Sequence, residues 1–355
     1  MSLKKIAELT GTSVSTVSRV LNHPEHRCNA TGLEEKIWAA ASSIQYVPNK
    51  VARELRLGCT SEKTPFIVDI FLTRFDSMDQ DLFFKELFQY VKDDLLKNGC
   101  VLGEILHAVD ILNLDSQTDD SSFIPFKNTG NSSKTGTSTI TIKENTGLMI
   151  LGKCPSKLIP ILKKRYAYIA GIDRNPTDYA YDEVICNGVT AAEKAVNYLI
   201  TLGHRNIAYI GDCTYEARYI GYYQTLLNHK LPLSHTNVHP TKQTAKEGYQ
   251  AMLTILKQEE RPSAIFCAND STALGVLKAL KEHKKKGYLP AIISIDNIEA
   301  SQNSTPMLTT IDIPKKEMSH LALTLLLDRK NKHHTEHVRL ELPCRLIERE
   351  SCYHL

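Results

Sequence analysis

Short apolar segments alternate with amphipathic segments through most of this chain, from residue 65 onward. Apolar runs predict strands at 66–72, 101–109, 147–152, 168–172, 207–211, 264–267, 291–295 and 338–342. Helical spacing of apolar residues predicts helices between several of them, at 83–97, 191–202, 248–258 and 272–283. Strands that alternate with helices form parallel βαβ sheets. There are too many such units for one compact sheet, so the pattern predicts two similar α/β lobes.

The excess positive charge of the chain lies in residues 1–57. These residues carry a net formal charge of +3, which equals the net charge of the whole chain, so the remainder is neutral. A small basic module suits contact with the phosphate groups of nucleic acid. The charge distribution therefore favours nucleic-acid binding by the N-terminal segment.

Two short helices separated by a glycine turn are predicted at the N-terminus. Gly11 can take a positive φ angle and turn the chain, and Ser13 stands where a helix N-cap belongs. The helix over 14–22 then directs one set of residues inward, Val17, Val20 and Leu21, and another outward, Val14, Ser15, Ser18 and Arg19. This is the helix-turn-helix pattern, whose second helix presents residues to base edges. A plain helical hairpin with an exposed arginine is the alternative.

A third helix and a short fourth one are expected next. Thr31 and Glu34 are spaced as in a capping box, ahead of an apolar stripe made of Leu33, Ile37, Trp38, Ala41 and Ile44. Pro48 then breaks the helix, and Asn49 can cap a segment over 50–57 that ends at Gly58. A helix of about eight residues is marginal alone and needs a partner.

Two N-terminal motifs resemble the LacI/GalR family of bacterial transcription regulators. They are Ser13-Val14-Ser15-Thr16-Val17-Ser18-Arg19-Val20-Leu21-Asn22 and Tyr46-Val47-Pro48-Asn49, followed by Ala52, Arg53 and Leu55. The resemblance implies that 50–57 is a hinge helix that pairs in the minor groove, with Leu55 as a wedge. It implies DNA contacts from Val14, Ser15, Thr16, Ser18, Arg19, Asn22, Asn49, Ala52, Arg53 and Leu55. Residues 23–33 depart from the family pattern, which puts one phosphate contact in doubt.

The resemblance extends through the body of the chain. Its motifs lie at 202–211, 264–275, 305–311 and 348–351. The implied fold is a three-helix headpiece (1–47), a hinge helix and linker (48–64), and a two-lobed effector domain of the Rossmann-like, periplasmic-binding-protein type (65–355). The N-lobe is expected over about 65–172 and 305–332, and the C-lobe over about 173–304 and 333–355, with crossovers near 172 and 305. Residues 110–145, which are rich in Ser, Thr, Asn and Gly, interrupt the strand–helix rhythm.

Polar residues at predicted strand ends are the candidates for an effector site. Asp173, Asn269 and Asp296 follow strands, and ligands bind at the carboxyl ends of parallel strands. The resemblance adds Arg218, which aligns with a ligand-anchoring arginine of the family. Together these groups suit sugar hydroxyls, which need both donors and acceptors. Candidate stacking residues are Phe75, Phe83 and Tyr215, with ordinary packing as the alternative. Asn269 and Asp270 have helix capping as their alternative role.

Several classes of function find little support in the sequence. No nucleophile is spaced with a base, which argues against an enzyme. The nine cysteines are scattered without a C-x-x-C pair, which suits free thiols in a reducing cytosol and argues against zinc. His333, His334 and His337 invite a metal site, but a solvated loop is the simpler interpretation. The N-terminus lacks the features of a signal peptide, which argues against a secreted solute-binding protein.

The sequence therefore predicts a cytoplasmic, nucleoid-associated repressor of a carbohydrate operon. We expect a homodimer that binds double-stranded operator DNA and a small sugar effector, with no cofactor, no metal and no membrane partner. Lobe closure on the effector would change the spacing of the hinge helices. The alternative partner is a phosphoprotein corepressor, contacted by Lys315, Lys316 and Arg329.

Overall fold

The computed structural model of this chain describes residues 3–22, 32–43, 65–73, 81–108, 110–111, 143, 145–214, 216–283, 285 and 287–355. The chain divides into two compact units, each made of several segments. Unit 1 comprises Met1–Arg74, Phe88–Ala170 and Ala322–Thr335, and unit 2 comprises Phe75–Leu87, Gly171–Leu321 and Glu336–Leu355. The hinge helix predicted over 50–57 and most of 110–145 lie outside the described residues. The domain boundaries given above therefore remain predictions.

Three short helices form the N-terminal part of the protein, as predicted. They are α1 (Leu3–Thr10), α2 (Val14–Asn22) and α3 (Leu33–Ser43), and their shared core contains the fully buried Ile6, Val17 and Ile37. Gly11 makes the turn at a φ of 65°. The Ser13 hydroxyl accepts a hydrogen bond from the Thr16 backbone N–H at 3.1 Å, so it caps α2 as the sequence predicted.

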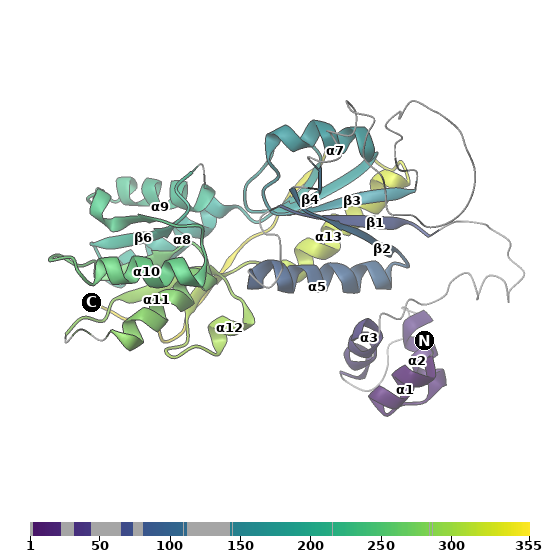
Figure 1. Ribbon diagram of the computed structural model, residues 1–355, viewed down its shortest axis with the longest axis horizontal. Helices are drawn as coiled ribbons and strands as arrows, with labels where there is room; N and C mark the ends of the chain where they lie inside the picture. The colour runs from purple at the N-terminus through teal and green to yellow at the C-terminus, as the bar shows by residue number, and fades with distance from the viewer. Residues whose placement is uncertain are drawn as a thin grey trace, which may run out of the picture. The chain divides into compact units, whose positions relative to one another are not determined.

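One of two six-stranded sheets, sheet A, has the strand order β11-β5-β4-β3-β1-β2. Its strands are β1 (Ile67–Leu72), β2 (Val101–Leu106), β3 (Thr146–Leu151), β4 (Tyr168–Asp173), β5 (Asp182–Ile185) and β11 (Arg339–Glu341). The pairs β1–β2, β1–β3 and β5–β11 are parallel. Helices α5 (Leu82–Lys97) and α13 (Lys315–Lys330) lie on one face of the sheet, and α7 (Ile159–Arg165) lies on the other (Figure 1). A short turn of 3-10 helix, η2 (Ser156–Leu158), precedes α7.

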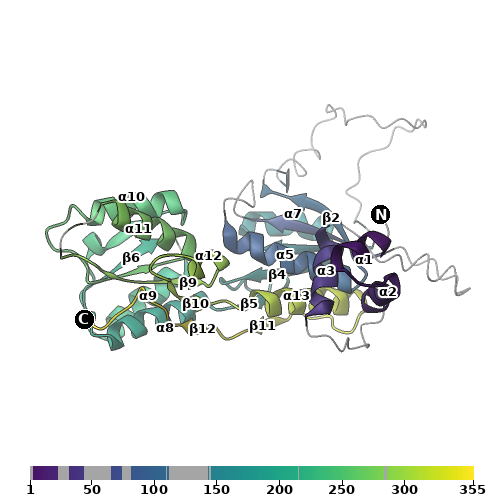
Figure 2. The same ribbon diagram turned by 90° about the horizontal axis from the view of Figure 1, so that it is seen from below.

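The other sheet, sheet B, has the order β12-β10-β9-β8-β6-β7. Its strands are β6 (Ile207–Gly211), β7 (Val238–Pro240), β8 (Ala264–Cys267), β9 (Ala291–Asp296), β10 (Thr309–Asp312) and β12 (Arg345–Ile347). Figure 2 shows this sheet between two helix pairs, α8 (Gly188–Thr201) with α9 (Ala217–Asn228), and α10 (Ala245–Ile255) with α11 (Asp270–Glu282). The remaining elements are η3 (His235–Asn237) and α12 (Glu299–Gln302). Strand β12 runs antiparallel to β10, whereas the other neighbouring strands of sheet B pair in parallel.

The strand order shows where the chain leaves each sheet. Strand β5 belongs to sheet A, so the chain leaves this sheet after Ile185, and β10 pairs with β9, so it leaves sheet B after Asp312. The compact units change at residues 170 and 321, and the crossovers expected near 172 and 305 stay predictions. The sequence pattern does not predict strand β5, because the strand is four residues long and begins with two acidic residues, Asp182 and Glu183. Asp182 accepts a hydrogen bond from the Val338 N–H at 2.9 Å, which attaches β11 to this edge.

Helices α9 and α13, and the short strands β7, β10 and β12, were also absent from the sequence prediction. Strands of three or four residues are too short to show a period, so only their pairing reveals them. Among the helices that the structure describes, none combines the length and the apolar character that a bilayer span requires.

Helices α10 and α11 approach each other through two glycines. A Cβ atom added at Gly275 would lie 1.9 Å from the Ala245 carbonyl oxygen, and one at Gly248 would lie 2.2 Å from the Thr272 carbonyl oxygen. Each glycine thus accommodates the backbone of the opposite helix. This close contact packs the two helices together on one face of sheet B.

We predict that Gly275→Ala destabilises the protein by about 1–3 kcal/mol, because the added methyl group forces the two backbones apart. Helix propensity alone would favour alanine by about 1 kcal/mol, so the sign of the effect is diagnostic. Urea unfolding measures it. Lys278→Ala, an exposed change on the same helix, is the matched control and should be near neutral. A Gly275→Ala protein as stable as the parent would contradict the close contact.

Candidate DNA-binding face and candidate effector site

The outward face of α2 carries the residues predicted to read DNA. Val14 is 43% exposed, Ser15 and Arg19 are exposed, and Thr16 and Ser18 are partly exposed. Val17, Val20 and Leu21 are buried on the opposite face. A guanidinium can form bidentate hydrogen bonds with the major-groove edge of guanine, and an apolar side chain can contact a thymine methyl group. The face therefore has the chemistry that base recognition requires.

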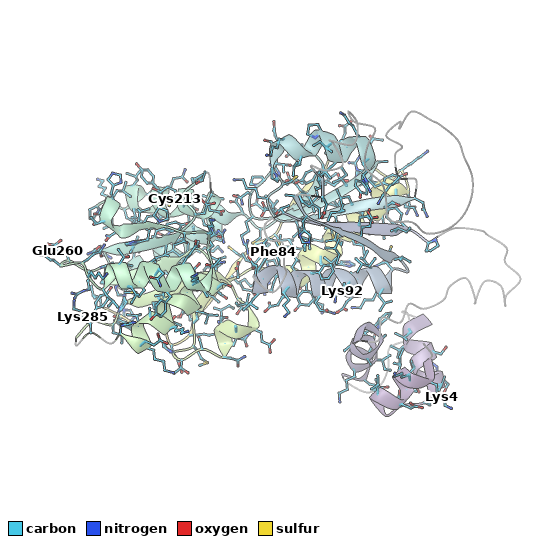
Figure 3. The ribbon with its side chains drawn as sticks, in the orientation of Figure 1. Lys4, Phe84, Lys92, Cys213, Glu260 and Lys285 are labelled. Atoms are coloured by element: carbon cyan, nitrogen blue, oxygen red, sulfur yellow. The ribbon has the colours of Figure 1, made fainter. Side chains whose placement is uncertain are left out.

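Basic residues flank this face on α1. Lys4 and Lys5 are both exposed, and Figure 3 shows the Lys4 side chain extending from the surface of the three-helix cluster. Asn22 ends α2. Four further residues predicted to contact DNA, Asn49, Ala52, Arg53 and Leu55, lie outside the described residues, so their roles stay predictions.

Arg218 lies at the start of α9, inside unit 2, and is 2% exposed. Its guanidinium donates to Glu216 Oε1 at 2.8 Å, to the Ala268 carbonyl oxygen at 2.7 Å and to Gln243 Oε1 at 2.8 Å. Although burial opposes it, the charge of Arg218 lowers the pKa of the Glu216 carboxyl to about 2. Both groups are therefore ionised, and Arg218 holds three loops at the carboxyl ends of the strands.

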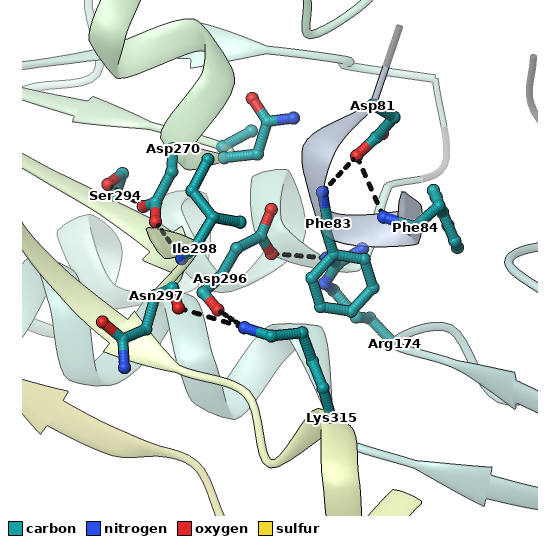
Figure 4. Close-up of polar contacts among 12 residues, drawn as sticks. Asp81, Phe83, Phe84, Arg174, Asp270, Ser294, Asp296, Asn297, Ile298 and Lys315 are labelled. Atoms are coloured by element: carbon teal, nitrogen blue, oxygen red, sulfur yellow. Dashed lines mark hydrogen bonds and ion pairs between the residues drawn. The ribbon is translucent and has the colours of Figure 1, made fainter. Parts of the chain in front are cut away.

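A second buried cation, Arg174, directly follows β4 and was not among the predicted residues. It forms a very short ion pair with Asp296, and its guanidinium lies 3.9 Å from the ring centroid of Phe83 (Figure 4). Asp296 ends β9 with a φ of 129°, in the region that residues other than glycine rarely adopt. The pair thus ties a backbone position under strain to the end of β4.

Lys315 completes the group and joins it to α5. Its ammonium donates to the Asp296 and Asn297 carbonyl oxygens at 2.7 and 3.0 Å (Figure 4). It also lies 3.3 Å from Glu86 Oε2. It is 7% exposed, so its inclusion among the corepressor contacts is wrong: the ammonium is committed to interactions within the protein.

Three buried polar atoms of this region make no hydrogen bond among the described residues. They are Asp173 Oδ2, Arg174 Nε and Gln243 Nε2. Asp173 and Arg174 are adjacent in the chain, and Gln243 is bonded to Arg218. Leaving such an atom unsatisfied costs about 1–3 kcal/mol. These atoms comprise one acceptor and two donors. Burial raises the pKa of the Asp173 carboxyl, against the opposing effect of Arg174.

Two predicted effector residues take the structural roles that were their alternatives. Asn269 caps α11: its Oδ1 accepts from the Thr272 N–H at 3.0 Å, and its Nδ2 donates to the Gln243 carbonyl oxygen at 3.1 Å. Phe83 is 4% exposed and packs edge-on against Phe84, with Arg174 over its face. Phe75 and Tyr215 lie outside the described residues. Effector contact by any of these residues stays a prediction.

Asp270 anchors the turn that follows β9. Its carboxylate accepts from the Ser294 hydroxyl at 2.5 Å and the Ile298 N–H at 2.9 Å (Figure 4). It also accepts from the Thr310 hydroxyl at 2.7 Å. Burial, with a contribution from the charge of Asp296, raises the pKa of Asp270 to about 7. Asp270 therefore titrates in the neutral range, and its protonation is coupled to the site.

Other features of the described chain carry less chemistry. A cavity of about 700 Å³ lies elsewhere on unit 2, lined by residues that include Leu277, Tyr288 and Pro306, and it contains none of the predicted effector residues. The Nδ1 atoms of His333 and His334 each lie 2.8 Å from the Asp328 carboxylate. Within the described ranges, no three His, Cys, Asp or Glu side chains are grouped to hold a metal ion.

Two family models match the chain. One, described as bacterial regulatory proteins of the lacI family, matches residues 2–49, and the other, a periplasmic binding protein-like domain, matches residues 196–352. Relatives named HTH-type transcriptional repressor PurR, from Photorhabdus laumondii and Vibrio atlanticus, are each 28% identical. The matches cover 99% of this chain and 96% and 98% of those proteins.

Solved structures share the fold. A complex of the transcriptional regulator CelR with cellobiose is 21% identical, with a TM-score of 0.65 over 99% of this chain and 100% of that one. The Lac repressor dimer bound to operator and the anti-inducer ONPF is 20% identical, with a TM-score of 0.64 over 99% of both chains. A LacI family regulator from Enterococcus faecium with bound ribose is 24% identical, with a TM-score of 0.63 over 81% of this chain and 99% of that one.

We predict that Asp270→Asn removes a pH dependence of stability. The pKa of Asp270 is raised in the folded state, so its contribution is fully present below about pH 4 and is lost as the pH rises through 7. Between pH 5 and pH 8 the parent protein should lose roughly 2–3 kcal/mol of unfolding free energy from this group. Urea unfolding at the two pH values measures it.

The exposed Asp178→Asn is the control and should retain the slope of the parent. An unchanged slope in Asp270→Asn would mean that another group titrates.

Proposed function

Because the chain belongs to the LacI family of bacterial regulatory proteins, we propose that it is a homodimeric repressor of a carbohydrate-utilisation operon whose operator affinity responds to a bound sugar. Membership makes it a DNA-binding transcription regulator and not an enzyme. The observation that carries the proposal is the presence, in one chain, of an exposed α2 reading face and a strand-end site with unsatisfied polar atoms. It acts in the bacterial cytoplasm, where operator DNA lies.

The α2 face supports direct base recognition. Arg19 is its one cation and stands beside Ser15 and Ser18, whose hydroxyls can donate to or accept from a base edge. A recognition helix of nine residues reads few base pairs. Two copies related by a two-fold axis, each on one half of a near-palindromic operator, give a longer site. The Lac repressor, of similar fold, was solved as a dimer on its operator.

The polar site in unit 2 supports a polyhydroxylated effector. A hydroxyl group both donates and accepts, so it satisfies Asp173 Oδ2 and the N–H groups of Arg174 and Gln243 in turn. A flat aromatic effector would need a free ring face, and the face of Phe83 is occupied by Arg174. CelR and the Enterococcus faecium regulator have cellobiose and ribose in their structures, respectively.

The structure gives less support to the two alternative functions considered from the sequence. A phosphoprotein corepressor was expected to contact Lys315, but the Lys315 ammonium is buried against Asp296, Asn297 and Glu86. A solute-binding protein does not require the exposed DNA-reading face of α2.

The primary experiment is a footprint on DNA upstream of the gene, with and without mono- and disaccharides. Absence of a protected duplex at low salt would overturn the proposal.

We predict that Arg19→Ala relaxes base preference at one position in each half-site. A two-pronged arginine–guanine contact contributes about 1–3 kcal/mol of discrimination, so the preference there should fall roughly 5- to 150-fold. Competition binding with operators substituted at single positions measures this. Lys4→Ala is the control, because an exposed lysine on α1 should affect all sequences equally. Uniform weakening by Arg19→Ala would instead assign Arg19 to a phosphate.

We predict that Asp173→Asn weakens the sugar response at least tenfold while operator affinity stays within twofold. The change replaces the unsatisfied Oδ2 acceptor by a donor of the same shape, so a sugar hydroxyl loses its acceptor. Operator release followed by fluorescence anisotropy, against sugar concentration, measures it.

Asp173→Asn is a cleaner test than Arg218→Ala, which would leave Glu216 buried without its cation. The exposed Asp178→Asn is again the control. A normal sugar response in Asp173→Asn would remove this residue from the effector site.

A further inference from the structure

The three helices that cover sheet A, α5, α7 and α13, all end in basic residues (Figure 1). Their last turns contain Lys97, Lys163, Lys164, Arg165, Arg329 and Lys330. Sheet B differs, because α8, α9 and α10 have no basic residue in their last turns and α11 has one, Lys281. Attraction between a cation and the C-terminal end of a helix dipole applies to both sheets equally. The helix dipole therefore does not account for the concentration of cations beside sheet A.

These helix ends lie at one edge of sheet A, the edge where its strands begin. Residues 98–100 connect α5 to β2, and residues 166–167 connect α7 to β4, so each helix ends beside the start of a strand. The ring centroids of Phe66, which precedes β1, and Tyr168, which begins β4, are 6.0 Å apart. The Lys330 ammonium at the end of α13 lies 4.5 Å from the centroid of the Phe66 ring. All three helices therefore end at the same edge.

Five lysines, which we call the basic edge, dominate the charge there: Lys97, Lys163, Lys164, Lys330 and Lys332. Lys330 is partly exposed and the other four are exposed, and none of the five forms an ion pair within the described part of the chain. Two acidic groups of the region already have partners. Glu104 lies 2.8 Å from Lys143 and 3.4 Å from Arg165, and Asp328 pairs with two histidines. The five ammonium groups are thus available to an external anion.

The chain enters sheet A from the DNA-reading helices at this same edge. Residues 44–64 connect α3 to Pro65, and β1 begins at Ile67. A chain extends by at most about 3.6 Å per residue, so residues 44–64 span no more than about 75 Å. When α2 binds its site, the basic edge is therefore held close to the DNA on either side of that site. The duplex carries about one negative charge per 1.7 Å of its axis, so it is a dense polyanion.

We propose that the basic edge is a second DNA-binding surface, which contacts the phosphate groups of the duplex that flanks the site read by α2. The inference rests on DNA binding by this chain and does not depend on the identity of its effector. Among polyanions, DNA fits best because the connection to α3 brings it to the edge. A lysine ammonium is a compact charge on a flexible stem, which suits phosphate and carries no base specificity. The surface adds affinity that is independent of sequence and dependent on salt.

The first experiment measures binding of the full chain to a random-sequence duplex by fluorescence anisotropy at several KCl concentrations. The double variant Lys163→Gln/Lys164→Gln removes two charges from the last turn of α7. Each phosphate contact contributes about 0.9 to the slope of log K against log salt, so the slope should become shallower by about 2 per protomer. The affinity at low salt should fall at least fivefold. An unchanged slope would overturn the inference.

Matched variants separate a DNA contact from other effects of the lysines. Lys230→Gln/Lys257→Gln makes the same charge change at two exposed positions of unit 2 and should keep the slope of the parent. Lys163→Arg/Lys164→Arg preserves the charge and should also keep it. Thermal unfolding tests for a purely structural role, which would lower stability and leave the slope unchanged. Equal losses of affinity in the two glutamine variants would attribute the effect to net charge and reject the surface.

The second experiment locates the contact on the DNA. The operator defined by footprinting is prepared with short flanks and with flanks of about 20 base pairs, which match the reach of the connection at about 3.4 Å per base pair. The longer flanks should raise the affinity of the parent at least fivefold and that of Lys163→Gln/Lys164→Gln less than twofold. An equal gain in both proteins would overturn the inference. Equal gains together with polyglutamate binding by the parent alone would assign the edge to an acidic protein instead.

These results are independent of the proposed sugar response. A chain that shows the expected slopes on random DNA, but protects no operator in a footprint, would overturn the proposed operon regulation and leave the basic edge intact. A chain that binds its operator and responds to sugar, but gains nothing from flanking DNA, would overturn the basic edge alone.

Discussion

Pairing of buried charges is the constraint on which unit 2 depends. Arg218, Arg174 and Lys315 are cations with exposed fractions of 2, 4 and 7%, and an unpaired charge at such a position would cost several kcal/mol. Each must meet an anion or several carbonyl oxygens. The partners, Glu216, Asp296 and Glu86, come from three separate parts of the chain. Satisfying the charges therefore brings the ends of β4 and β9 and the starts of α9 and α5 to defined positions.

The same constraint explains the chemistry of the site. The buried carboxylates of the site pair with nearby cations, so most of its polar atoms already have partners within the protein. Only a few buried polar atoms lack a hydrogen bond among the described residues. Asp173, Arg174 and Gln243 each contribute one such atom. Asp270 shows the other outcome of burial, a carboxyl group whose pKa rises into the neutral range despite three hydrogen bonds. The unsatisfied atoms and the carboxyl group with the raised pKa thus have one cause, the burial of polar groups.

The sequence was informative where structure is local. The helix-turn-helix could be predicted because Gly11 and Ser13 act within one turn. The positions of Asp173 and Asp296 at strand ends could be predicted because apolar strands precede them, while their contact with an effector stays a prediction. The sequence was less informative where partners are distant. Nothing near Arg174 or Gln243 shows that they meet Asp296 and Arg218, and four-residue β5 lacks a readable period. The pairing of β5 with β11 joins segments about 150 residues apart, which the sequence did not predict.

Both sheets take an edge strand from the final part of the fold. Strand β11 closes sheet A beside β5, and β12 closes sheet B by antiparallel pairing with β10. Among the described strands these two come last in the chain, so each sheet gains this edge only after its other strands have been synthesised. The helices α1, α2 and α3, by contrast, pack around a core that lies within residues 6–41. The helix cluster therefore depends on contacts close in sequence, whereas each sheet depends on a strand brought from far along the chain.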